Sequence, residues 1–171
     1  TGRGKTSLVS LINRMYDATE GTVSVYGLPK YTYIQENYGI AAVEEAVKFV
    51  TEALKLANPE KCFIGHIADD EFLVVHYFDE KENLSAVIGN TIDRSTSVFF
   101  NQIEEYNVRN NREYYVEVNC GCSPVDAGWE ENLESFIKFA KGEMYMNRLK
   151  SGMGAVIKEE TAPGEYYKAF E

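Results

Sequence analysis

The sequence has little of what membrane, secreted or nucleic-acid-binding proteins need. No stretch approaches the run of about 20 consecutive apolar residues that a transmembrane helix requires. The three cysteines are Cys62, Cys120 and Cys122, and an odd number without regular spacing argues against a disulfide framework. Lys and Arg number 17 against 27 Asp and Glu, which gives a net charge of −10. We therefore expect a cytoplasmic protein that neither inserts into a membrane nor binds the phosphates of nucleic acid.

The apolar residues that are present predict one folded domain. A chain of 171 residues with 44% hydrophobic residues is long enough to bury a core. We expect this domain over residues 1–157 and a tail or linker over residues 158–171. Hydrophobic periodicity predicts strands over 22–27, 62–67, 72–78, 114–122 and 154–160, and helices near 8–15, 41–57, 84–106 and 133–144. This order indicates an α/β protein of the α+β sandwich type, in which helices flank a central, mostly antiparallel sheet of about five strands.

Two of the predicted strands form the clearest local feature of the sequence. The segments 62–67 and 72–78 are apolar runs separated by a short polar link that contains Asp69 and Asp70. Two strands joined by so short a link predict a β-hairpin. We therefore expect an antiparallel hairpin over residues 62–78, with both aspartates at its tip.

The start of the chain contains part of a phosphate-binding motif. Gly4-Lys5-Thr6 matches the end of the G-x-x-x-x-G-K-[ST] loop, in which backbone N–H groups and a lysine bind phosphates. The first glycine of that motif would lie before Thr1, and the strand that should precede the motif is missing from the sequence. Asp79-Glu80, after an apolar run, imitates the acidic strand end of such enzymes. We interpret the opening residues as the start of a helix, and a P-loop nucleotidase stays open as an alternative.

The hairpin resembles the signature hairpin of the GGDEF family, the diguanylate cyclase domains, whose tip reads R-x-G-G-D-E-F. Ala68-Asp69-Asp70-Glu71-Phe72 occupies the five signature positions. Other segments resemble further family motifs in the same order: Thr1-Gly2 the opening, 26–39 the D-x-D-x-F-K-x-I-N-D-x-Y-G segment, 114–126 the T-x-S-x-G strand and 142–152 the A-L-Y-x-A-K-x-x-G helix. The chain thus resembles a degenerate member of this family, with ADDEF in place of GGDEF.

The resemblance implies an activity with definite metal requirements. Family members condense two GTP molecules into cyclic di-GMP, and Mg²⁺ held by carboxylate ligands neutralises the triphosphates. The ligands come from the first Asp of D-x-D, its neighbouring backbone and the acid at the third signature position. Here the D-x-D positions are Gly27 and Pro29, which offer no carboxylate, so Asp70 is at most one remaining metal ligand. No cofactor is therefore expected, and Mg²⁺ only if nucleotide binding survives.

The two signature glycines are also replaced. Glycine allows a tight turn and a close approach of the backbone to the nucleotide. Ala68 adds a methyl group at the first position, and Asp69 adds a negative charge beside a tetra-anionic substrate. Two like charges about 4 Å apart cost roughly 1 kcal/mol in water and more in a half-buried site. The retained acids Asp70 and Glu71 are the catalytic candidates, and we expect them to be insufficient by themselves.

Three further positions bear on nucleotide binding. The guanine-reading Asn and Asp of the family correspond to Gln35 and Glu44, which keep the hydrogen-bonding type but are one methylene longer. The phosphate-binding Lys of the last helix corresponds to Arg148. Together with Ala68 and Asp69, these are the nucleotide-binding positions that the resemblance implies, as remnants of the family site.

The function implied by the resemblance is therefore regulatory. We expect a catalytically inactive domain of a bacterial multidomain signalling protein that transmits a signal or dimerises, with residual GTP binding left open. The expected partners are a second copy of the chain and an upstream sensor domain, with weak or no binding of GTP. The domain would lie in the cytoplasm, either free or as the cytoplasmic part of a membrane-bound receptor. An active diguanylate cyclase that uses Asp70 and Glu71 is the first alternative, and a P-loop nucleotidase is the second.

Overall fold

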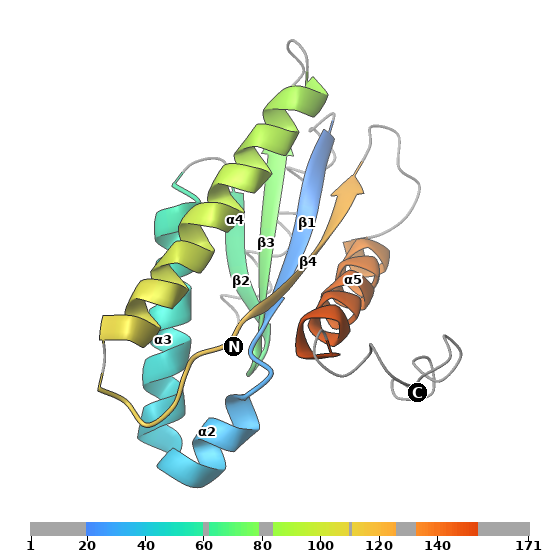
Figure 1. Cartoon of the computed structure of the whole chain (residues 1–171). Helices are drawn as coiled ribbons and strands as arrows, with labels where there is room; N and C mark the ends of the chain where they lie inside the picture. Colours follow the sequence, from blue (N-terminus) through green and yellow to red (C-terminus); the bar gives the residue numbers. More distant parts are fainter. Residues whose placement is uncertain (1–19, 60–61, 79–83, 110, 126–132, 154–171) are drawn as a thin grey trace, which may run out of the picture.

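The computed structural model describes residues 20–59, 62–78, 84–109, 111–125 and 133–153 (Figure 1). In chain order its elements are β1 (Glu20–Gly27), α2 (Tyr31–Tyr38), α3 (Ile40–Ala57), β2 (Cys62–Ala68), β3 (Glu71–Phe78), α4 (Leu84–Arg109), β4 (Asn119–Val125) and α5 (Leu133–Met153). None of the helices in these stretches is both long and apolar enough to cross a membrane.

The described strands form one sheet in the order β2-β3-β1-β4. Strand β1 lies in the interior and pairs antiparallel with β3 on one side and with β4 on the other. Strands β2 and β3 form an antiparallel hairpin, with Asp69 and Asp70 in the turn between them. The hairpin and the mostly antiparallel sheet predicted from the sequence are therefore confirmed.

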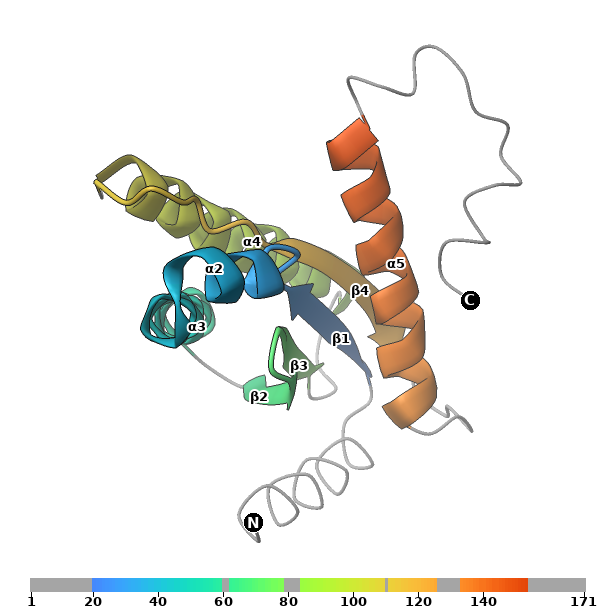
Figure 2. The same cartoon turned by 90° about the horizontal axis from the view of Figure 1, so that it is seen from below.

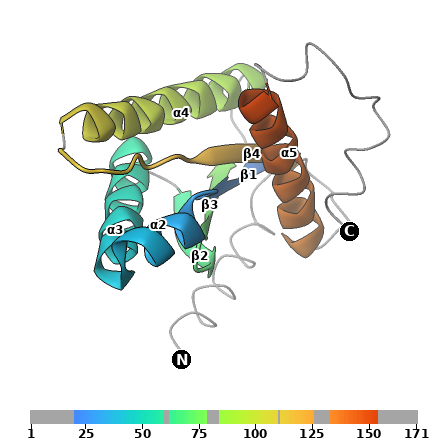
Figure 3. The ribbon, with the colours of Figure 1, turned by 60° about the horizontal axis from the view of Figure 1, so that its bottom comes forward.

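Helices cover both faces of this sheet, with α3 and α4 on one face and α5 on the other (Figures 2 and 3). The alternation of side chains along β1 explains the two layers. Val23 and Val25 belong to an apolar cluster that includes residues of α5, whereas Tyr26 belongs to a cluster with α3 and α4. Both faces of the sheet are apolar, as a sheet between two helical layers requires.

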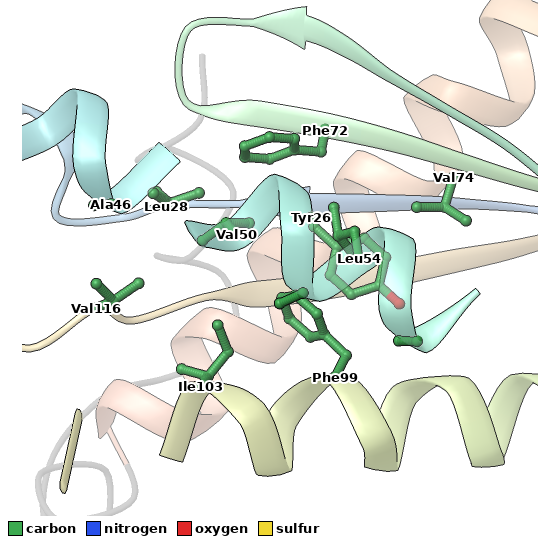
Figure 4. Close-up of a cluster of buried hydrophobic side chains, with 12 residues drawn as sticks. Tyr26, Leu28, Ala46, Val50, Leu54, Phe72, Val74, Phe99, Ile103 and Val116 are labelled. Carbon is green, nitrogen blue, oxygen red and sulfur yellow. The ribbon is translucent and has the colours of Figure 1, made fainter. Parts of the chain in front are cut away.

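The larger apolar cluster lies between the sheet, α3 and α4 (Figure 4). Phe72, Leu54 and Phe99 are fully buried in it, one each from β3, α3 and α4. The rings of Tyr26 and Phe99 meet edge to face with their centroids 5.0 Å apart. Since burial of an apolar side chain of this size contributes roughly 1.5 to 3 kcal/mol, this cluster holds both helices firmly against β1 and β3.

The strand predicted over 114–122 is displaced in the structure. Strand β4 begins only at Asn119 and continues to Val125, and the preceding residues are irregular. The reason is Asn107 on α4, whose side chain donates to the carbonyl of Val116 at 2.9 Å and accepts from its N–H at 2.8 Å. Asn107 thus satisfies the backbone groups that a neighbouring strand would otherwise bind. The predicted alternation still holds, because Val116 is buried and Val118 packs against the same cluster.

Other expectations differ or lie outside the described residues. Helix α2 was not predicted, and α5 extends to Met153, beyond the predicted end at residue 144. The described sheet has four strands instead of about five, and the expected fifth strand over 154–160 lies outside the described residues. The tail over 158–171 and the Gly4-Lys5-Thr6 motif lie outside them as well.

Helix α5 lies unusually close to β4 at Gly121. A Cβ atom built on Gly121 would lie 2.0 Å from the carbonyl oxygen of Ala140 and 2.2 Å from the backbone nitrogen of Met144. Real Cβ atoms do not approach backbone this closely, so only glycine fits at this position. The contact fixes the distance between α5 and the sheet. It therefore also fixes the positions of the α5 side chains that lie near the end of β1.

Replacing Gly121 with alanine should therefore destabilise the domain strongly. The new methyl group would meet backbone atoms of α5, which cannot move aside, so we expect a loss of about 3 kcal/mol or more, the upper end of overpacking effects. Gly142→Ala on the same helix is the matched control. Nothing lies within 4 Å of its Cβ position, and alanine should stabilise the helix by up to about 1 kcal/mol. Urea unfolding of both variants measures the difference, and equal stabilities would contradict the close contact.

Candidate functional site

The tip of the hairpin meets the end of β1 and the middle of α5. Gly27 at the end of β1 pairs with Glu71 at the start of β3, and the N–H of Leu28 donates to the carbonyl of Asp70 at 2.9 Å. A cavity of about 130 Å³ opens at this junction. Its lining residues are Gly27, Leu28, Pro29, Asp70, Glu71, Asn119, Met144, Tyr145 and Arg148. This cavity is the candidate site, because it collects several of the positions that the sequence singled out.

Glu71 is held by two side chains of α5. The residue is 7% exposed, and its carboxylate lies 2.6 Å from Lys141 Nζ and accepts a hydrogen bond from the Tyr145 hydroxyl at 3.2 Å. Lys141 and Tyr145 are four residues apart on a helix and therefore lie on the same side of it. A buried carboxylate needs such partners, because an unpaired charge is costly to remove from water.

The electrostatics of these groups follow from the same contacts. The hydrogen bond to Glu71, followed by the negative charges of Glu71 and Asp70, raises the pKa of Lys141 against the opposing effect of burial. Burial and the charge of Glu71 raise the pKa of the Tyr145 hydroxyl. At neutral pH, Lys141 is therefore a cation and Tyr145 a hydrogen-bond donor, and both act on Glu71.

Three of the other signature positions, Ala68, Asp69 and Asp70, are less enclosed than Glu71. Asp70 is half-buried and lines the cavity, whereas Ala68 and Asp69 are exposed and do not. Phe72 is fully buried in the core beneath the hairpin. Asp69, which takes the place of the second signature glycine in the resemblance, thus places its charge at the surface of the turn.

Gly27 and Pro29 stand at the end of β1, where the resemblance implied carboxylates. A Cβ atom on Gly27 would lie 2.8 Å from Met144 Sδ and 3.1 Å from its Cε. The thioether of Met144 therefore fills the direction in which a longer side chain at position 27 would extend. Pro29 lines the cavity but offers no ligand atom from its side chain.

These residues do not fit the Mg²⁺ ion that the resemblance implies. Two ligand positions have no carboxylate, Glu71 is already bound to Lys141, and only Asp70 is left on the cavity wall. Among the described residues, no cluster of three or more His, Cys, Asp or Glu side chains is suited to a metal ion. A divalent cation prefers several oxygen ligands, and while Lys141 is bound to Glu71 this cavity does not supply them.

Of the remaining positions predicted from the sequence, one lines the cavity and two do not. Arg148 on α5 is exposed and lines the cavity, as a phosphate-contacting residue would. Gln35 on α2 and Glu44 on α3 are exposed and do not line it. The structure therefore brings Gly27, Pro29, Asp70, Glu71 and Arg148 together in one cavity lining, whereas Gln35, Glu44, Ala68 and Asp69 are exposed and do not belong to it.

The sequence analysis missed Lys141, Met144 and Tyr145 as parts of this site. Met144 has helical spacing with the apolar residues Leu133, Ile137 and Ala140, and the structure places it over Gly27. Lys141 directly follows Ala140, and Tyr145 directly follows Met144, so both lie at the border of the apolar face of the helix. This position was the available signal that they could contact a buried group. Nothing local could have shown that their partner is an acid on the hairpin.

A larger groove of about 690 Å³ adjoins the cavity. It lies between α4 and the residues before β4, and it shares Pro29, Asn119 and Arg148 with the smaller cavity. Lys30 and Glu117 form an ion pair of 2.5 Å between two of its lining residues. Arg148 thus lies at the junction of the groove and the cavity.

The fold is that of solved GGDEF domains. The GGDEF domain of TpbB, also named YfiN, from Pseudomonas aeruginosa has a TM-score of 0.67 at 13% identity, over 86% of this chain and 84% of that one. The FimX GGDEF domain from the same organism has a TM-score of 0.63 at 10% identity, over 85% and 88%. The GGDEF domain of DgcB from Caulobacter crescentus, solved with c-di-GMP, has a TM-score of 0.58 at 14% identity, over 86% and 80%. No protein-family model and no curated protein matches the sequence.

The contact between Gly27 and Met144 predicts a coupled effect on stability. Gly27→Asp should destabilise the domain modestly, because its Cβ meets the end of the flexible Met144 side chain, and Met144→Ala should do so by roughly 2 to 5 kcal/mol because Met144 is buried. The double variant should lose less than the sum, by about 0.5 kcal/mol or more, since the second change makes room for the first. Met146→Ala on the exposed side of α5 is the control and should add to Gly27→Asp without coupling. Urea unfolding tests the cycle, and strict additivity with Met144 would contradict the contact.

Proposed function

We propose that this chain is a degenerate GGDEF signalling domain that does not synthesise cyclic di-GMP. It acts as a regulatory or dimerising module of a bacterial multidomain protein. The observation that carries the proposal is the end of β1, where Gly27 offers no carboxylate and Met144 fills the space beside it. Without that ligand the triphosphate cannot be neutralised in the way that the family chemistry requires.

The hairpin tip adds two further obstacles to catalysis. Asp69 places a negative charge on the exposed turn, where it repels an anionic substrate. Glu71 is retained, but Lys141 and Tyr145 contact its carboxylate, so a metal ion or a substrate proton has to compete with them for its oxygens. This contact argues against the alternative of an active cyclase that relies on Asp70 and Glu71.

Residual nucleotide binding would be weak and would not involve a metal. Arg148 on the cavity wall supplies one cation for a phosphate group. Gln35 and Glu44 are exposed on α2 and α3, where they could contact a base only at the surface. We therefore propose weak or no GTP binding and no requirement for a cofactor.

The regulatory role requires partners. We propose a second copy of the chain and an upstream sensor domain as those partners, with the module in the cytoplasm or on the cytoplasmic side of a receptor. The P-loop alternative depends on Gly4-Lys5-Thr6, which lie outside the described residues, and no observation in the described part of the chain favours it.

The proposal predicts that the domain forms no cyclic di-GMP from GTP and Mg²⁺. The assay follows product formation chromatographically, with a dimerising helix fused before Thr1 so that two sites can meet, and with an active diguanylate cyclase as the positive control. Gly27→Asp and Asp69→Gly should each remain inactive, because residues that serve one site act together.

The decisive repair variant combines Gly27→Asp, Pro29→Asp, Ala68→Gly and Asp69→Gly with Met144→Ala, which makes room for the new carboxylate. Turnover that appears only in this variant supports the proposal. Turnover by the unmodified domain would contradict it.

A further inference from the structure

Both carboxylate oxygens of Glu71 are occupied by side chains of α5. Oε2 lies 2.6 Å from Lys141 Nζ, and Oε1 accepts the hydrogen bond of the Tyr145 hydroxyl at 3.2 Å. The side chain of Glu71 is only 10% exposed. The carboxylate therefore already has the cation and the hydrogen-bond donor that an enclosed acid needs.

A divalent cation at the hairpin tip would compete for the same atoms. Hard cations bind carboxylate oxygens, and Glu71 and Asp70 are the acids that line the cavity. A metal ion coordinated by Glu71 would lie close to the ammonium group of Lys141, and the two positive charges would repel each other. Lys141 therefore lowers the affinity of Glu71 for a metal ion.

We propose that the ammonium group of Lys141 replaces a divalent metal ion at the hairpin tip and is the built-in counter-ion of Glu71. The inference rests on the proposed function and deepens it, because it explains how a hairpin that keeps both signature acids is stabilised without metal. The counter-ion belongs to α5, so it ties the hairpin to that helix. Removal of the ammonium group alone should uncover a cation site formed by Glu71 and Asp70.

Tyrosine-sensitised Tb³⁺ luminescence tests this directly. Tb³⁺ binds carboxylate oxygens, and the ring of Tyr145 lies beside the site because its hydroxyl contacts Glu71. Lys141→Met removes the charge but keeps the length of the side chain. We expect it to raise the affinity for Tb³⁺ by about tenfold or more, which corresponds to about 1.4 kcal/mol. Added Glu71→Gln should abolish the gain.

Matched variants isolate the role of the ammonium group. Lys138→Met removes the same charge from an exposed position one turn earlier on α5 and should gain no site. Lys141→Arg keeps a cation and should gain none either. Because the chain has 12 tyrosines, the signal is read as the difference between these variants. If Lys141→Met does not fold, Lys141→Gln, which can still donate a hydrogen bond to Glu71, replaces it.

The outcomes separate this inference from the proposed function. A gain in Lys141→Met or Lys141→Gln that is absent from Lys141→Arg and Lys138→Met supports the inference. It is overturned if a folded neutral variant gains no site, or if the unmodified chain gives a Tb³⁺ signal that Glu71→Gln removes. A Tb³⁺ signal of the unmodified chain that depends on Glu71, without synthesis of cyclic di-GMP, contradicts only this inference. Synthesis of cyclic di-GMP by the unmodified chain contradicts the proposed function.

Discussion

The backbone contact between α5 and β4 at Gly121 sets the position of the α5 side chains at the candidate site. Because a Cβ there would lie 2.0 Å from the carbonyl of Ala140, the helix can settle onto the sheet only over a glycine. This close approach brings Met144 against Gly27 and Lys141 within reach of Glu71. A helix standing further from the sheet would weaken both contacts at once, since both residues extend from the same turn of α5.

The two contacts close the site in complementary ways. Met144 fills the place where a carboxylate at the end of β1 would project, and Lys141 holds the acid that remains on the hairpin. On the proposals made above, an apolar side chain and an internal cation take the space and the charge that a bound metal ion would need. On this account the substitution at position 27 and the lysine on α5 belong together, because an unfilled space and an unpaired acid would each destabilise the hairpin tip.

The sequence predicted the parts of the fold that depend on local pattern. The hairpin over 62–78 follows from two apolar runs and a short link, and the buried stripe of α3 follows from its helical spacing. The start of β4 could not be predicted, because it depends on Asn107 of α4 binding the backbone of Val116. Among the residues that line the cavity, Gly27 and Asp70 were singled out through the resemblance. Lys141 was missed because its helical spacing indicates only the border of a buried face, and its partner Glu71 lies 70 residues away in the sequence.

The central claim is that the hairpin tip no longer binds a nucleotide through a metal ion. Calorimetric titration of the domain with GTP, once with Mg²⁺ and once with EDTA, tests it most directly. The account predicts the same result in both titrations, either no heat of binding or a weak affinity in the millimolar range. Micromolar binding that requires Mg²⁺ and disappears in Asp70→Asn would contradict it.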